Sequence, residues 1–90
     1  MQSIWKFPLG VSAAIDIRMP VGARILCVQA QFGTPCIWAL VDIDAPKLVA
    51  RTFYTYGTGH QHEAMTGVYV GTYQLEGGAL VFHVFEGITP

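Results

Sequence analysis

The chain has 90 residues, of which 52% are apolar and 12% are charged, and its formal net charge is −1. This length predicts a single domain, and five Lys and Arg residues spread along it exclude nucleic-acid binding by a large basic patch. No apolar run approaches a membrane span and residues 1–8 lack a signal-peptide core, so we expect a cytoplasmic protein.

Seven segments have the composition of short β-strands, and no helix of useful length is expected. In chain order they are 3–7, 14–19, 23–31, 36–41, 49–56, 68–75 and 79–86. Their number and spacing predict an all-β fold in one domain over residues 1–90. It is either an antiparallel sandwich or a barrel-like roll.

Alternation within the strands predicts which side chains share a face. Residues 14–19 alternate between apolar and polar, which is typical of a strand at or near a sheet edge. Residues 36–41 are apolar throughout, so we expect them to be covered on both faces. In 23–31 the alternation places Leu26 on the face of Val28 and Ala30, and in 68–75 it places Tyr69 on the face of Tyr73.

Two turns are predicted from glycine positions. A two-residue loop at Gly33-Thr34 would join 23–31 to 36–41 in a hairpin, and Gly77-Gly78 suits a type I′ turn. The first loop would place Cys27 opposite Leu40 and Cys36 opposite Gln31. That register brings no two sulfurs together, so we expect buried free thiols.

The composition also predicts self-association. Ordinary proteins carry about 25% charged residues, so this chain has few with which to cover its surface. A second copy that covers part of the apolar surface would make a homo-oligomer, and the alternative is a monomer with an unusually apolar exterior. The aromatic residues expected at an interface are Trp5, Trp38, Tyr69 and Tyr73.

The candidate ligand site is the region 54–63 together with Arg51. Its glycines would let backbone N–H groups approach an anion, a tyrosine ring would stack on a nucleotide base, and a histidine would add charge. The alternative is a surface loop in which the glycines only permit the turns. The residues predicted to bind the ligand are Arg51, Tyr54, Tyr56, Gly57, Gly59 and His60.

Metal binding and catalysis have weaker support. His60, His62 and Glu63 offer ligand atoms, but no accompanying metal motif is present, so we expect no metal and no cofactor. Cys36, His60 and Asp42 are residue types of nucleophilic catalysis. However, Cys36 lies in an apolar strand that disfavours its thiolate, so we expect no catalytic residue and no enzyme.

His83 lies between valine and phenylalanine residues in segment 79–86, and we expect it to be a hydrogen-bonded histidine of the core or of an interface.

Five stretches together resemble a family of short proteins of unassigned function associated with tailed phages and prophages. They are IWKFPL (4–9), MPVGARILCVQ (19–29), GTPCIWALVD (33–42), YGTGH (56–60) and YVGTYQLEGGALVFHVFE (69–86). The resemblance implies a small accessory protein that acts by binding. The leading hypothesis is a protein that neutralises a host defence component by direct contact. The alternatives are a protein that sequesters a nucleotide in a pocket between subunits and a minor structural or assembly protein.

Overall fold

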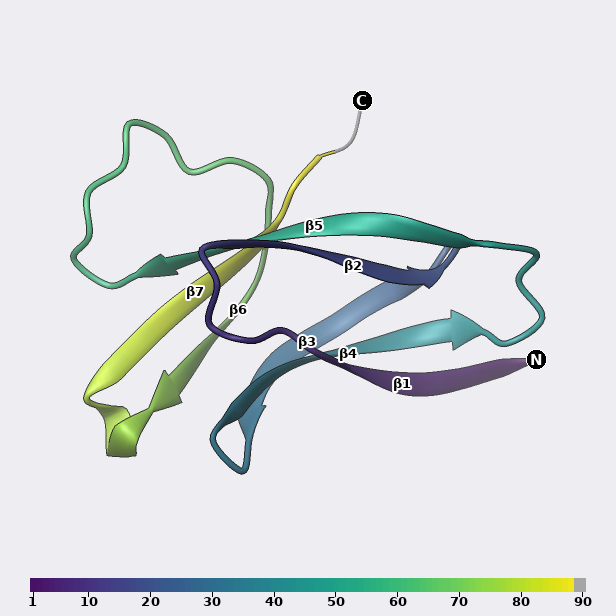
Figure 1. The fold of residues 1–90 in the computed structure, drawn as a ribbon, viewed down its shortest axis with the longest axis horizontal. Coiled ribbons are helices and arrows are strands. Elements are labelled where there is room, and N and C mark those ends of the chain that lie inside the picture. The colour runs from purple at the N-terminus through teal and green to yellow at the C-terminus, as the bar shows by residue number, and fades with distance from the viewer. Residues whose placement is uncertain (89–90) are drawn as a thin grey trace.

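The strands of this computed structural model, which describes residues 1–88, form two antiparallel sheets (Figure 1). The first has the order β1-β4-β3 and the second the order β2-β5-β7-β6. The bounds are β1 (Gln2–Pro8), β2 (Ala14–Pro20), β3 (Arg24–Gln31), β4 (Thr34–Asp42), β5 (Leu48–Gly57), β6 (Val68–Leu75) and β7 (Leu80–Glu86). The all-β prediction is confirmed, the fold is a sandwich, and β2 is an edge strand as expected. Among the described residues, no helix is long and apolar enough to cross a membrane.

The core lies between the two sheets. Phe53 of β5 and Val84 of β7 are fully buried on the inner side of the second sheet, and Ile37 and Ala39 of β4 are fully buried on the inner side of the first. Apolar side chains that meet across two sheets are the main stabilising contribution of a sandwich. The alternation of β5 therefore determines which of its side chains face the core and which face solvent.

Tyr73, a predicted interface residue, belongs to this core and is only 3% exposed. Burial raises the pKa of its phenol, and the nearby Thr55 hydroxyl acts in the opposite direction. The two hydroxyls lie near each other without the geometry of a hydrogen bond, so both are buried and unpartnered.

Two β-bulges correct the predicted faces. In β3 the register moves between Ile25 and Cys27, so Leu26 is an extra residue and Ile25, not Leu26, shares the inner face with Val28. In β6 the register moves between Tyr69 and Gly71, so Tyr69 pairs with Phe85 on the outer face. A bulge adds one residue to one strand and reverses the alternation beyond it. Tyr69 and Tyr73 therefore lie on opposite faces of the sheet.

The β3–β4 turn also differs from its prediction. Gln31 pairs with Thr34, so the two-residue loop is Phe32-Gly33. Both loop residues have positive φ angles, 50° and 77°, which define a type I′ turn. A β-branched threonine strongly resists positive φ, which explains why the loop does not use Thr34.

This register changes the neighbours of both cysteines. Cys27 pairs with Trp38, and Cys36 pairs with Gln29, in place of the predicted partners. Both cysteines are free thiols; Cys36 is buried and Cys27 is half-buried. Buried free thiols were expected at both positions, but only Cys36 is buried, and the register from which the expectation was argued is wrong.

The β6–β7 connection is longer than a type I′ turn. Leu75 pairs with Leu80, so four residues (76–79) connect the strands, and they include the short 3-10 turn η1 (Glu76–Gly78).

The predicted loop after β5 is present and contains no strand between Gly57 and Val68. At the end of β7, Gly87 donates its N–H to Thr52 O at 2.8 Å.

Replacing Phe32 with Asn is expected to raise the free energy of unfolding by about 1 kcal/mol, because Asn tolerates the left-handed conformation that costs Phe energy. The Phe32 side chain is 99% exposed, so little packing is lost. Urea unfolding measures the change. Phe32→Val, which is β-branched, should lower stability, and equal stability of the two variants would contradict this explanation.

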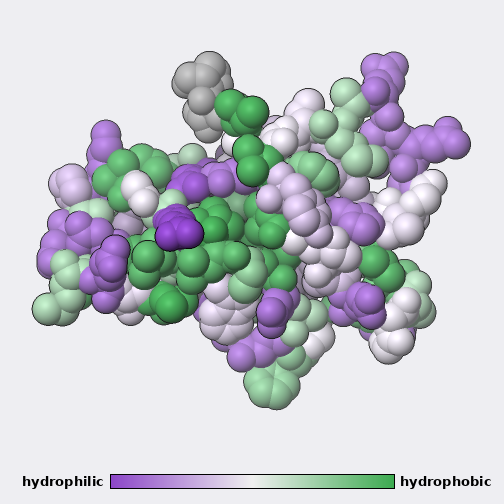
Figure 2. Space-filling view, turned by 180° about the vertical axis from the view of Figure 1, so that it is seen from behind, coloured by the Kyte–Doolittle hydropathy of each residue, from purple (hydrophilic) through white to green (hydrophobic). Residues whose placement is uncertain are grey.

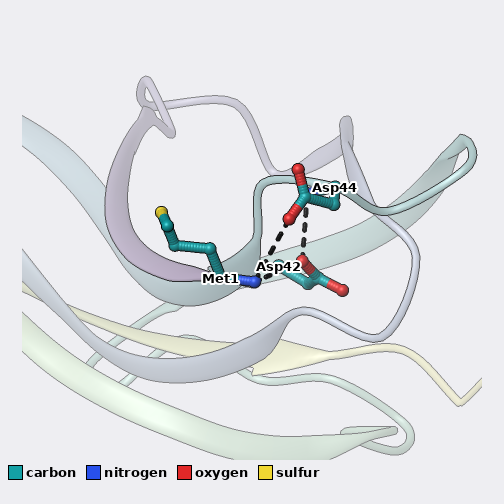
Figure 3. A network of polar contacts seen from close by, with 3 residues as sticks. All are labelled: Met1, Asp42 and Asp44. Carbon is teal, nitrogen blue, oxygen red and sulfur yellow. Dashed lines mark hydrogen bonds and ion pairs between the residues drawn. The ribbon is translucent and has the colours of Figure 1, made fainter.

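The turn after β4 contains a small network of charges (Figure 3). The Met1 ammonium lies 3.4 Å from Asp42 Oδ1 and 3.2 Å from Asp44 Oδ2, and the Asp44 backbone N–H donates to Asp42 Oδ1 at 3.0 Å. That backbone hydrogen bond is the main reason why the pKa of Asp42 is lowered from 3.8. Desolvation opposes the shift and the ammonium adds to it.

A lowered pKa means that the Asp42 carboxylate stabilises the folded state fully above pH 3.8 and loses this contribution as pH falls through the folded-state pKa. We therefore expect the stability difference between wild type and Asp42→Asn to shrink in strong acid. An NMR titration should place the Asp42 pKa below 3.8. A midpoint at or above that value would contradict the network.

Candidate binding surface

The outer side of β5, β7 and β6 carries a group of aromatic rings, here called the aromatic face. It consists of Tyr54 and Tyr56 from β5, Phe85 from β7 and Tyr69 from β6. Phe85 lies at the centre: it is the register partner of Tyr54 and Tyr69, and its ring centroid is 5.6 Å from that of Tyr56 and 5.5 Å from that of Tyr69. Both ring pairs are edge-to-face, the arrangement that aromatic quadrupoles favour. Tyr69 is 55% exposed and the other three rings are half-buried, so the face is accessible from solvent.

A chain of hydrogen bonds borders this aromatic face. Thr58 Oγ1 donates to Val81 O at 3.2 Å and lies 2.6 Å from His83 Nε2, while His83 Nδ1 lies 2.9 Å from Thr72 Oγ1. Tyr69 Oη completes the chain 2.7 Å from Thr72 Oγ1. Because the Thr58 hydroxyl proton is used on Val81 O, Thr58 Oγ1 accepts a hydrogen bond from His83 Nε2–H. These hydrogen bonds hold the Tyr69 and His83 side chains in place.

His83 therefore has the hydrogen-bonded role that the sequence predicted, and it is half-buried on the outer face rather than in the core. His62, from the loop after β5, packs edge-on against Tyr56 with ring centroids 4.8 Å apart. This contact extends the aromatic face beyond the sheet.

The predicted ligand residues do not gather in one place. Tyr54 and Tyr56 are on the aromatic face, but Arg51 points to the inner side of β5. Its guanidinium pairs with Glu86 through Nε–Oε2 (2.5 Å) and Nη2–Oε1 (2.9 Å), and Nη1 donates to Ala23 O. A ligand stacked on these tyrosines therefore does not reach the Arg51 side chain of the same chain.

Gly57 and His60 contribute to a separate groove of about 430 Å³, which they line together with Thr58 and residues 79–82. The His60 backbone N–H donates to Gly57 O at 3.1 Å, and Gly59, with φ +82°, allows this tight turn. A Cβ on Gly57 would lie 2.7 Å from the His60 ring, so any larger residue there would displace the ring from its present position.

The two tryptophans lie on the first sheet, away from the aromatic face. Trp5 is 39% exposed and packs near Phe7 at 6.4 Å between ring centroids. Trp38 is half-buried on the outer side of β4, with Lys6 Nζ 6.0 Å from its ring centroid. On the outer side of β4, Cys36 is only 2% exposed but Trp38 and Leu40 are half-buried, so the strand is covered on both faces only in part.

The residue types considered for catalysis are dispersed. Cys36 is buried near one end of β4, Asp42 is exposed at the other end, and His60 lies in the loop after β5. Within residues 1–88, no three His, Cys, Asp or Glu side chains are close enough to hold a metal ion.

Sequence reasoning missed Phe85, Thr58 and Thr72 as parts of the surface. The alternation of residues 81, 83 and 85 already placed Phe85 on one face with His83. The pairing of β7 with β5 brings that face next to the tyrosines. The contribution of Thr72 depends on the β6 bulge and was not visible in the alternation.

The fold and this surface define a small antiparallel β-sandwich domain with an accessible aromatic face. The chain belongs to the family described as a domain of unknown function, DUF7352, whose model matches residues 1–90. The expectation of a short family of unassigned function is thereby confirmed. No curated protein and no solved structure matches the chain.

Proposed function

We propose that this protein is a phage-type accessory protein that acts by binding, and that it neutralises a host defence component through its aromatic face. The observation that carries the proposal is the set of four aromatic rings on the solvent side of three adjacent strands. Tyrosine and tryptophan are enriched among residues that contribute most to protein binding, because they offer large contact areas at low entropy cost.

The geometry favours a protein partner over a nucleotide. The rings are held in place by strand pairing and by the hydrogen bonds that reach Tyr69, so little side-chain entropy is lost on binding. A nucleotide would also need cationic donors for its phosphates, and the Arg51 guanidinium lies on the opposite side of β5. Of the side chains predicted to bind a nucleotide, only Tyr54 and Tyr56, which would stack on the base, lie on the aromatic face.

Self-association is part of the same proposal. Several large apolar side chains are exposed outside the aromatic face, among them Val11 (70%), Phe32 (99%) and Leu48 (49%). Surfaces of this kind support a contact with a second copy. Size-exclusion chromatography with light scattering is expected to give a mass above the 9.8 kDa of one chain, and a single-chain mass at high concentration would contradict this part.

The neutralising role is tested in bacteria that carry individual defence systems and are challenged with phage. Expression of the wild-type protein is expected to raise phage plating at least tenfold in one such strain. Tyr56→Ala should abolish the effect, while Ile4→Ala, which removes an exposed side chain from the other sheet, should retain it. Unchanged plating in every strain, or full activity of Tyr56→Ala, would contradict the proposal.

A further inference from the structure

A groove of about 370 Å³ lies between β3 and β6 and is separate from the groove at His60. Its walls are Ala23 and residues 24–26 of β3 on one side and residues 68–70 of β6 on the other, with Arg51 and Glu86 between them. The two strands approach closely at Gly71, where a Cβ would lie 2.9 Å from Val28 Cγ1. The groove therefore lies beside the N-terminal halves of both strands.

Both walls consist of edge strands, since β3 pairs only with β4 and β6 only with β7. Each consequently has backbone N–H and C=O groups on one side that no strand of either sheet uses, which is the requirement for adding an extended peptide. The bulge residues Leu26 and Val70 both line the groove. A bulge also disrupts long, regular pairing, so the groove accommodates a short segment better than a long strand.

The groove combines aliphatic surface with an excess of positive charge. Ile25, Leu26, Val68 and Val70 supply the aliphatic part, and hydrophobic residues gather in the middle of the molecular face toward which β3 and β6 lie (Figure 2). The charged residues that line it are Arg24, Arg51 and Glu86, which sum to +1. None of the ion pairs within residues 1–88 uses Arg24.

Arg51 retains capacity for an anion. Its guanidinium has five N–H donors, and the contacts with Glu86 and Ala23 O engage three of them. The side chain is 21% exposed, so the remaining donors are not sealed in the core. A ligand carboxylate placed here would add charge-assisted hydrogen bonds to a guanidinium that the protein already holds in position.

From these features we infer that the β3–β6 groove binds the extended C-terminus of a protein partner, with an aliphatic side chain next to the terminal carboxylate. The carboxylate lies toward Arg24 and Arg51, and the aliphatic side chain contacts Leu26 and Val68. The groove volume is near the lower end of the range for ligand sites, about 300–1,000 Å³, which suits a chain end of two or three residues. This inference rests on the proposed function, because it assumes a protein partner.

The test uses two acetylated peptides of the same sequence that end in valine, one with a free carboxylate and one amidated. Backbone amide signals of the whole chain are followed by NMR. The free-acid peptide is expected to shift the signals of residues 24–26 and 68–70. It should also bind at least about tenfold more tightly than the amide, because a charge-assisted hydrogen bond contributes about 1.5–3 kcal/mol. Absence of shifts in the groove at millimolar peptide, or equal binding of both peptides, would overturn the inference.

Matched variants and a small-molecule probe complete the test. Arg24→Gln should weaken the free-acid peptide about tenfold, and Arg18→Gln, on β2 and outside the groove lining, should leave it unchanged. Octanoate supplies a carboxylate on an aliphatic chain without a peptide backbone; if it shifts the same signals with equal affinity, the site takes small acids and the peptide assignment is wrong. Tyr56 does not line the groove, so Tyr56→Ala should leave peptide binding intact. If this variant binds the peptide but no longer captures the partner, the result tests the proposed function and leaves the groove inference unaffected.

Discussion

Replacing Glu86 with Leu is expected to lower the free energy of unfolding by about 3 kcal/mol, because it leaves the Arg51 guanidinium in a largely buried place without its counter-charge. The two side chains are only 21% and 20% exposed, and they face the interior of the sandwich. In the variant, Arg51 would retain a single hydrogen bond, to Ala23 O. Removing one partner of a buried pair is usually far more costly than removing both.

The double variant Arg51→Met/Glu86→Leu is the matched control. It replaces both charges with apolar side chains of similar length, so its stability should return to within about 1 kcal/mol of wild type. Chemical unfolding of the two single variants and the double variant gives the comparison. A Glu86→Leu cost below about 1 kcal/mol, or a double variant as unstable as the sum of the singles, would show that the pair is not a buried unit.

Gly67→Ala is expected to be the other strongly destabilising change, at about 3 kcal/mol or more. Gly67 has a φ of +102°, which L side chains rarely adopt, and a Cβ there would lie 2.2 Å from Glu86 O. The backbone at the start of β6 would have to move away from the end of β7.

Gly59→Ala separates the two causes of this effect. Gly59 also has a positive φ, +82°, but a Cβ there would meet no atom within 4 Å. Its replacement should therefore cost about 1 kcal/mol, the backbone part alone. If the two variants unfold at the same denaturant concentration, the close contact between Gly67 and Glu86 is absent.

The strands and most of their faces could be predicted because burial imposes a period of two. Residues 14–19 and 49–56 alternate, and the structure places Phe53 inside and Tyr54 outside as that alternation requires. The prediction failed where one residue is inserted. The bulges at Leu26 and Val70 reverse the alternation; Gly71 follows the second bulge, but no glycine or proline lies beside the first. Their positions depend on how the strand partners fit together, which local sequence does not contain.

The candidate site was predictable in part for the same reason. The tyrosines of β5 were correctly grouped with each other, but Arg51 shares its alternation with Phe53 and therefore belongs to the inner side. The alternation of a strand places the side chains of Arg51 and Tyr54 on opposite faces. The ligand hypothesis nevertheless assigned both residues to one site. The hydrogen bonds from Thr58 to His83 and Thr72 bring together a loop and two strands, so they required the tertiary structure.

We propose the aromatic face as the part of this protein that binds a partner. The most direct measurement is affinity capture from host cells with quantitative mass spectrometry, using wild type, Tyr56→Ala, Tyr69→Ala and Ile4→Ala in parallel. We expect wild type and Ile4→Ala to retain one host protein in stoichiometric amount, and both tyrosine variants to lose at least nine-tenths of it, since a central aromatic contact is worth about 2 kcal/mol. Equal recovery of that protein by all four forms, or no stoichiometric partner with wild type, would contradict the claim.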